Sequence, residues 1–277
     1  MQYLVLVLLL FLCYVVPSQS DIHVSPAGGG YLEIYAPGDH VFVDDHNNFD
    51  VNLQRNGFTV EMWAYLKRPM KSPLVRVEPF DRWTLIYKAG SYEFVLRATG
   101  TVSQQVGEGG TSQRGNGFDI PVNQWFYVAL MISEQYTQVA IDDRLKGEIN
   151  DFPTFGNAAS PLRIGGGPTP PIEGELRWNS FVDGLIDEIR ISKIVRYPKE
   201  KIEGQWGWSD IIVVPEGPLE TDKHTVALWH FNFDNRRGGS RFRDASGNGH
   251  HLTYHEAYLD VRPHGKLATT WGNLKME

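Results

Sequence analysis

Apolar and polar residues alternate with a period of two along several short stretches of the chain. In residues 58–65, Phe58 and Met62 share one face, whereas Trp63 and Tyr65 lie on the other. This alternation predicts a β-strand, because successive side chains of a strand point to opposite faces. The two aromatic residues on the second face indicate that this face is covered too, either by another layer or by loops.

Similar runs recur along the chain with turn residues between them. They are residues 31–35, 40–43, 83–88, 92–98, 125–132, 137–141, 162–165 and 185–191. Short strands at such spacing predict an all-β protein, with two antiparallel sheets packed as a sandwich or jelly roll. Asp142-Asp143-Arg144 predicts a tight hairpin turn. Residues 99–117 and 165–179 are rich in Gly, Pro and polar residues, and they predict long surface loops.

The C-terminal part carries one more strand pattern after a change in composition. Residues 226–233 place Trp229 and Phe231 on an apolar face that needs a partner. We therefore expect this strand either to fold back on the sandwich or to begin a second, truncated module. Folding back is favoured, because fewer than about 40 residues do not normally build a core alone.

The first residues predict export. Residues 1–16 are apolar and uncharged, and Pro17-Ser18-Gln19-Ser20 follows with small residues where a signal peptidase cleaves. We expect a signal peptide cleaved after Ser20 and a secreted or extracytoplasmic product. A single-pass anchor is the alternative, since no Lys or Arg precedes the apolar run. Cys13, the single cysteine, lies in this run, so the mature chain contains no disulfide.

The charge composition argues against some classes of binding partner. The chain has 26 Lys plus Arg against 33 Asp plus Glu, a formal net charge of -7. This balance argues against nucleic acid as a partner, because a phosphate backbone attracts basic surfaces. No stretch after the leader approaches the roughly 20 apolar residues of a spanning helix, so no membrane association is expected after signal removal.

Five segments carry a family likeness in one order along the chain. They are residues 58–63, 122–129, 141–143, 161–166 and 182–191. Together they resemble laminin G-like, concanavalin A-like jelly rolls. The resemblance spans residues 31–197 and implies two curved antiparallel sheets packed face to face.

The likeness also suggests a division of the chain, and one motif is displaced. Members of this family often begin with a strand like Leu228–Phe233 and a turn like Asp244–His251, which here follow the last matched strand. We divide the chain into a signal peptide (1–20), the sandwich (21–208), a connector (209–223), a returning strand and turn packed on the sandwich (224–259), and a loosely ordered tail (260–277).

Catalytic motifs do not emerge from the sequence. Glycosidases on this fold use two carboxylates on one strand face. Glu173 and Glu175 flank a glycine in an expected loop, whereas Asp187 and Glu188 are adjacent and would point to opposite faces of a regular strand. A Gly-x-Ser-x-Gly elbow, a His-Glu-x-x-His motif and a phosphate-binding glycine loop are absent from the sequence.

A structural calcium ion is the cofactor that the resemblance implies. It points to a site where the start of the domain meets its last strand, which would bring Asp39 towards Asp187. Alternatively, Asp39 stabilises its turn and Asp187 accepts backbone hydrogen bonds, with Asp44-Asp45 as a solvated pair. The histidines at positions 230, 250, 251 and 255 raise the idea of a transition-metal site, although His-His in an Asn-Gly turn more commonly lies at the surface.

These observations favour an exported, non-catalytic recognition module that binds carbohydrate or an extracellular protein through loops at the sandwich edge. Trp178, Trp206 and Trp208 lie in Gly-rich or polar segments and are the candidate ligand contacts. Two other classes stay open: a glycan-active enzyme on the same fold, and a structural or adhesive spacer.

Expression with the native leader tests the export prediction. We expect the product outside the cytoplasm with Asp21 as its first residue, because the apolar run ends in a small-x-small site. N-terminal sequencing checks this. A mature chain that still begins at Met1 would instead support a membrane anchor.

Overall fold

The structure is a computed structural model of the 277-residue chain. It describes residues 23–34, 39–51, 57–67, 82–97, 101–106, 113–114, 120–149, 159–172, 175–198, 210–232 and 241–254. The leader and the expected tail lie outside these ranges. Among the described residues, no helix has the length and apolar character needed to cross a membrane.

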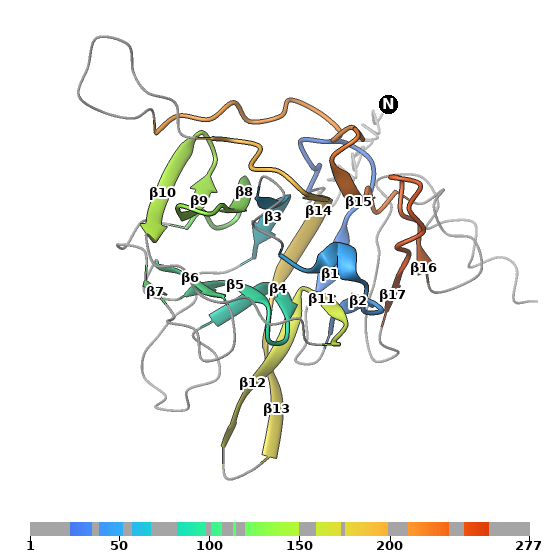
Figure 1. The fold of residues 1–277 in the computed structure, drawn as a ribbon. Helices are drawn as coiled ribbons and strands as arrows, with labels where there is room; N and C mark the ends of the chain where they lie inside the picture. Colours follow the sequence, from blue (N-terminus) through green and yellow to red (C-terminus); the bar gives the residue numbers. More distant parts are fainter. Residues whose placement is uncertain are drawn as a thin grey trace, which may run out of the picture.

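Two antiparallel sheets form the body of the protein (Figure 1). The seven-stranded sheet has the order β1-β14-β3-β8-β9-β10, with β15 also paired to β14. Its strands are β1 (Leu32–Ile34), β14 (Gly184–Ser192), β3 (Phe58–Leu66), β8 (Trp125–Ile132), β9 (Thr137–Ile141), β10 (Arg144–Ile149) and β15 (Thr225–Trp229). The expected jelly-roll sandwich is confirmed.

The eight-stranded sheet has the order β16-β17-β2-β11-β4-β5-β6-β7. Its strands are β16 (Arg241–Phe242), β17 (Leu252–Tyr254), β2 (Val41–Val43), β11 (Leu162–Ile164), β4 (Arg82–Lys88), β5 (Tyr92–Arg97), β6 (Thr101–Val106) and β7 (Gln113–Arg114). A short 3-10 helix, η1 (Asn47–Phe49), follows β2. A separate hairpin, β12 (Gly166–Ile172) and β13 (Glu175–Phe181), projects from the body (Figure 1).

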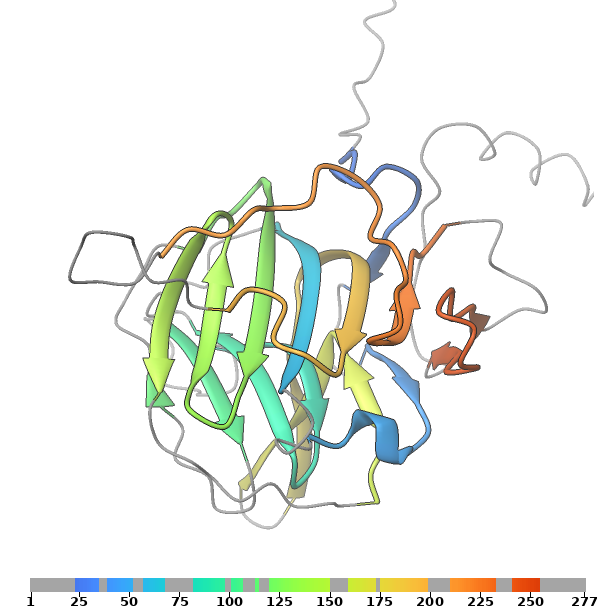
Figure 2. The ribbon, with the colours of Figure 1, turned by 45° about the horizontal axis from the view of Figure 1, so that its top comes forward.

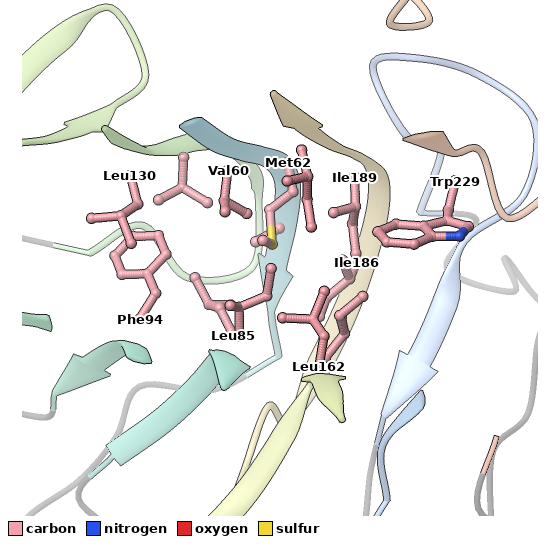
Figure 3. Packing of buried hydrophobic residues seen from close by; sticks show 14 of the residues in the cluster. Val60, Met62, Leu85, Phe94, Leu130, Leu162, Ile186, Ile189 and Trp229 are labelled. Atoms are coloured by element: carbon pink, nitrogen blue, oxygen red, sulfur yellow. The ribbon is translucent and has the colours of Figure 1, made fainter. Parts of the chain in front are cut away.

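The main core lies between the two sheets. Val60, Met62 and Ile186 of the seven-stranded sheet point towards Leu85 and Leu162 of the eight-stranded sheet (Figure 3). All five are fully buried. Each buried aliphatic side chain contributes roughly 1.5–3 kcal/mol through the hydrophobic effect, so a core of this extent can replace a disulfide framework.

Two segments that the sequence predicts as long loops contain strands. Residues 101–106 and 113–114 extend the eight-stranded sheet as β6 and β7, and residues 166–172 and 175–181 pair as β12 and β13. Polar and proline-rich composition misleads here because pairing partners, not local apolar periodicity, stabilise these strands. Proline is tolerated in β12 because the hairpin leaves one edge of each strand unpaired.

The C-terminal part adds strands to both sheets, as the folding-back prediction expects. β15 pairs with β14, with Ile191 opposite Ala227, while β17 pairs with β2, with Phe42 opposite Thr253. Trp229 is fully buried at one end of the main core (Figure 3). The apolar face of residues 226–231 therefore packs between the sheets, and the segment forms part of the same core.

The turn that follows β15 occupies the outer edge of that strand. This C-terminal turn, residues 244–250, is held by Asp244, whose carboxylate accepts hydrogen bonds from the backbone N–H groups of Leu228, Ser246 and His250 at 2.9–3.0 Å. The Asn248 side chain donates to the carbonyl oxygens of β15. The polar residues of the displaced motif thus satisfy an edge that would otherwise present unpaired backbone groups.

Loss of the Trp229 side chain tests whether the C-terminal strand belongs to the core. We expect Trp229→Ala to lower the free energy of unfolding by about 3–5 kcal/mol, because it removes a buried aromatic side chain. Val213→Ala is the control: Val213 is 83% exposed, so its change should stay within about 0.5 kcal/mol. Urea unfolding measures both.

A truncation supplies the second arm of this test. Without residues 222–277 the mature chain loses β15 and β17, and it should unfold at a lower temperature and with a lower slope against urea concentration. Cooperative unfolding at the temperature of the intact chain would mean that the C-terminal part is an appendage.

Candidate functional site

The outer face of the seven-stranded sheet is covered by the protein's own chain. Trp63, Tyr127 and Met131 on this face pack with Ala27 and Ile212, which belong to segments before β1 and after β14. Trp63 is 7% exposed, and Tyr127 is fully buried. The segment after residue 210 bridges to Arg144 of β10 through Ile211 and then crosses towards β15 (Figure 2). The prediction that the second face is covered is confirmed.

A buried carboxylate, Glu61 of β3, anchors this covering. Arg190 Nε lies 2.6 Å from its carboxylate and Arg196 Nε lies 3.2 Å away, while the hydroxyls of Tyr127 and Tyr197 donate hydrogen bonds to it. Burial, followed by the negative charge of Glu61, raises the pKa of both tyrosines. The two phenols therefore stay protonated and act as donors, so this charged group is fully paired.

The outer face of the eight-stranded sheet differs from that of the seven-stranded sheet in the side chains it carries. Val41, Val43, Leu162 and Ile164 belong to the main core, so the residues between them point outwards. Cross-strand register aligns these outward positions in a transverse row: Thr253 of β17, Phe42 of β2, Arg163 of β11, Tyr87 of β4 and Glu93 of β5, with Gln105 of β6 paired to Glu93 along the backbone. The row crosses five neighbouring strands.

The chemistry of the transverse row is mixed aromatic and polar. Phe42, Tyr87 and Arg163 are each half-buried, and Glu93 is 7% exposed. Burial lowers the pKa of Arg163, with a smaller opposite effect from Tyr87, yet a guanidinium stays charged in proteins. Half-buried aromatic faces beside a few fixed polar groups are the usual composition of a small-molecule recognition surface.

The β12–β13 hairpin begins beside this row. A side chain at Gly167 would come within 3.2 Å of Thr84 and 3.4 Å of Tyr87, so a glycine allows the hairpin to start directly against β4. Trp178, expected in a loop, lies in β13 one residue after Arg177, which pairs with Thr169. Trp178 therefore belongs to the β12–β13 hairpin, which leaves the eight-stranded sheet beside the transverse row.

The other two tryptophans stay untested. Trp206 and Trp208 lie outside the described residues. The transverse row itself escaped sequence reasoning, because Phe42, Tyr87 and Arg163 come from three separate segments. Only the strand register brings them together. The alternation within each strand could indicate which residues point outwards, but not which strands are neighbours.

The two predicted calcium ligands are both buried. Asp39 is 1% exposed and precedes β2, and Asp187 is fully buried in β14. Asp187 accepts a hydrogen bond from the Glu188 N–H at 2.8 Å, and its Oδ2 is buried without a hydrogen-bond partner of normal geometry. Burial raises its pKa to about 9, against the opposing effect of the nearby Ser25 side chain.

The donor set fits calcium only in part. The buried Oδ2 of Asp187 is an oxygen that a cation would satisfy. Among the described residues, however, no three Asp, Glu, His or Cys side chains are arranged to hold a metal ion. Calcium would therefore need main-chain carbonyl oxygens as its other ligands. The alternative pair, Asp44-Asp45, is exposed, and Asp45 lies 2.7 Å from the buried Lys88 ammonium.

Asp187 and Glu188 do not alternate as a regular strand would require. The register between β14 and β3 shifts between Asp187 and Arg190, and Glu188 has a φ of +52°. This bulge lets the buried Glu188 carboxylate accept the Leu219 N–H at 2.9 Å and lie 2.8 Å from His230 Nδ1. Both carboxylates are engaged inside the fold, which is not the arrangement of an acid–base pair open to a saccharide.

The histidines take separate roles. His230 pairs with Glu188, and His250 packs against His46 and Phe49, with ring centroids 4.7 Å apart in both contacts. His251 Nδ1 accepts a hydrogen bond from the Asp244 N–H. His255 lies outside the described residues.

Solved structures share the fold at low sequence identity. A protein from Bacteroides ovatus, described as a candidate carbohydrate-binding protein, is 13% identical with a TM-score of 0.51; the match covers 85% of this chain and 59% of that one. The chain therefore spans little more than half of that protein. The likeness establishes the fold alone.

Two further structures match more weakly. A SAP-like pentraxin from Limulus polyphemus is 12% identical with a TM-score of 0.42, covering 62% of this chain and 79% of that one. Domains LG4-5 of the mouse laminin alpha1 chain are 13% identical with a TM-score of 0.39, covering 60% and 41%. Comparison with curated proteins gave no match.

A family model decides the assignment. The model described as the Concanavalin A-like lectin/glucanases superfamily matches residues 36–200, more than half of the 277 residues. The matched segment holds β2 to β14, including most of both sheets. The chain belongs to the concanavalin A-like lectin/glucanase superfamily.

Proposed function

We propose that the protein is a non-catalytic recognition module that binds carbohydrate on the outer face of the eight-stranded sheet. The observation that carries the proposal is the transverse row, in which Phe42 and Tyr87 flank Arg163 in register. Aromatic rings offer flat apolar area to the C–H faces of a sugar, while the guanidinium donates hydrogen bonds to its oxygens.

The covering of the opposite sheet supports this choice of face. Side chains such as Trp63 and Tyr127 are already buried there against the protein's own chain. A ligand on that face would have to displace those contacts and uncover the paired Glu61, which is costly for a buried charge. The eight-stranded sheet keeps half-buried aromatic and charged side chains on its outer face, where a ligand would not uncover Glu61.

The carboxylates of the described residues favour binding without catalysis. Asp187 and Glu188 are fully buried, and Glu93 accepts a hydrogen bond from Thr84 at 3.4 Å in the row. A glycosidase would need two carboxylates about 5 Å apart at the bound sugar. Incubation with any glycan that binds should leave its reducing ends unchanged.

Export is part of the proposal, since the leader predicts it and an extracellular glycan or protein is the expected partner. An extracellular protein as ligand, or a spacer role, is the competing outcome. The experiment below separates these outcomes from carbohydrate recognition.

A glycan-array screen of the mature protein tests the proposal. We expect Phe42→Ala and Tyr87→Ala each to weaken binding of the best glycan by about 5–30-fold, the effect of losing about 1–2 kcal/mol of contact energy. Val213→Ala changes an exposed residue of the segment that covers the seven-stranded sheet, so this variant should bind like the wild type.

Other results would redirect the proposal. Binding that survives both row variants but is lost on Trp206→Ala or Trp208→Ala would move the site to the loops. No glycan bound, with and without calcium, would contradict carbohydrate recognition.

Calcium binding at Asp187 is a separate proposal with a thermodynamic test. A cation held only by the folded state raises the melting temperature by mass action, so calcium should raise it and a chelator should lower it. Asp187→Asn should abolish that response. An equal melting temperature with calcium and with chelator would remove the site.

The pH dependence of the calcium-free protein checks the same residue. The pKa of Asp187 is about 9 in the folded state, above the ordinary value of 3.8, so the folded state holds the proton more tightly. Stability from this group is therefore present below pH 3.8 and is lost as the pH rises towards 9. Asp187→Asn should flatten this decline in urea-unfolding free energy.

A further inference from the structure

His250 lies where the C-terminal turn meets the N-terminal half of the chain. Its ring packs 4.7 Å from His46, with an angle of 63° between the rings, and 4.7 Å from Phe49 of η1. His250 is 6% exposed, whereas His46 is exposed. The contact joins segments about 200 residues apart in the sequence, and its centre is an imidazole.

The surroundings of His250 favour its neutral form. Its Nε2 is buried without a hydrogen-bond partner, so the doubly protonated, charged ring would hold an N–H there with no acceptor. The titratable and charged groups that face it are His46 from the η1 segment, Lys193 after β14, Asp244 from its own turn and His251, the next residue in the chain.

The balance of these charges opposes protonation. Burial lowers the pKa of His250, and His46, His251 and Lys193 lower it further, whereas Asp244 acts in the opposite direction. The Asp244 carboxylate already accepts three backbone hydrogen bonds, one of them from the His250 N–H at 3.0 Å. The Asp244 carboxylate therefore holds the turn through its backbone N–H groups.

The turn carries core contacts with it. The carbonyl oxygen of His250 accepts the indole N–H of Trp229 at 2.8 Å, and Trp229 is fully buried in the main core. Directly after the turn, β17 pairs with β2, where Thr253 lies opposite Phe42. Displacement of His250 would thus disturb both the last core strand and the edge of the transverse row.

We infer that His46, Phe49 and His250 form an acid-sensitive latch: protonation of the buried His250 imidazole releases residues 241–254 from η1. The neutral ring packs between an aromatic and an imidazole ring, whereas the charged ring would be buried with no acceptor at Nε2 and would face the unfavourable charges of His46 and Lys193. The latch is closed at neutral pH and opens in mild acid, within the range where histidine changes charge.

The direction of the effect follows from proton linkage. A folded-state pKa below the usual 6.5 means that the unfolded segment binds the proton more tightly. The stability contributed by His250 is therefore fully present above pH 6.5 and is lost as the pH falls below it. Between the pKa of His250 in the unfolded segment and its lower pKa in the folded state, the open population rises by up to about tenfold for each unit by which the pH falls.

Hydrogen exchange of the full mature chain at pH 7.5 and pH 5, corrected for intrinsic rates, measures the latch. We expect peptides from residues 241–254 to exchange faster at pH 5, while peptides from β8 and β9 keep their protection. His250→Phe keeps a ring between His46 and Phe49 and cannot be protonated, so it should abolish the difference.

Two further variants make the outcome specific. His224→Gln removes a histidine outside the latch and should respond to acid like the wild type. His46→Phe keeps a ring beside His250 and removes the second charge, together with the hydrogen bond that His46 Nδ1 accepts from the Asn48 N–H at the start of η1. It should shift the opening to lower pH, which keeps the test decisive if His250→Phe does not fold. Equal protection of residues 241–254 at both pH values, or acid opening that persists in His250→Phe, would overturn the latch.

Discussion

The edge of β14 that faces away from β3 pairs with strands from both ends of the chain. β1 pairs with Gly184 to Ile186, and β15 pairs with Ile189 to Ser192, so both lie on the side of β14 opposite β3. Asp187 and Glu188 occupy the gap between them, and the bulge with its left-handed Glu188 is where the pairing partner changes. Backbone groups of a buried strand must find partners, and neither end of the chain supplies enough of them alone.

Other features follow from this meeting of the chain ends. Gly30 approaches the backbone of Phe231 so closely that a side chain there would lie 2.5 Å from its carbonyl oxygen, and the Gly30 N–H donates to the Asn232 side chain at 2.8 Å. To reach this edge from β14, the chain crosses the outer face of the seven-stranded sheet, which it covers. The same route that completes the sandwich therefore leaves the eight-stranded sheet as the face for recognition.

The pattern of apolar residues predicted strands that line the main core. The alternation of residues 58–65 matches β3, and the apolar face of Trp229 and Phe231 correctly required a partner in the core. The strands β6, β7, β12 and β13 could not be predicted in the same way, because polar, Gly and Pro residues dominate their sequences and the strands depend on their pairing partners. Glu188 was misread as part of a regular strand, since a positive φ at a glutamate is imposed by tertiary pairing.

The site was less predictable than the fold for the same reason. The positions of Phe42, Tyr87 and Arg163 become one surface only through the register of β2, β11 and β4. Chemical-shift mapping of the mature protein with its best glycan tests this surface most directly. The account predicts changes concentrated at Phe42, Tyr87 and Arg163. Changes confined to residues 193–198 and 210–219, which follow β14, or to residues 201–209, would contradict it.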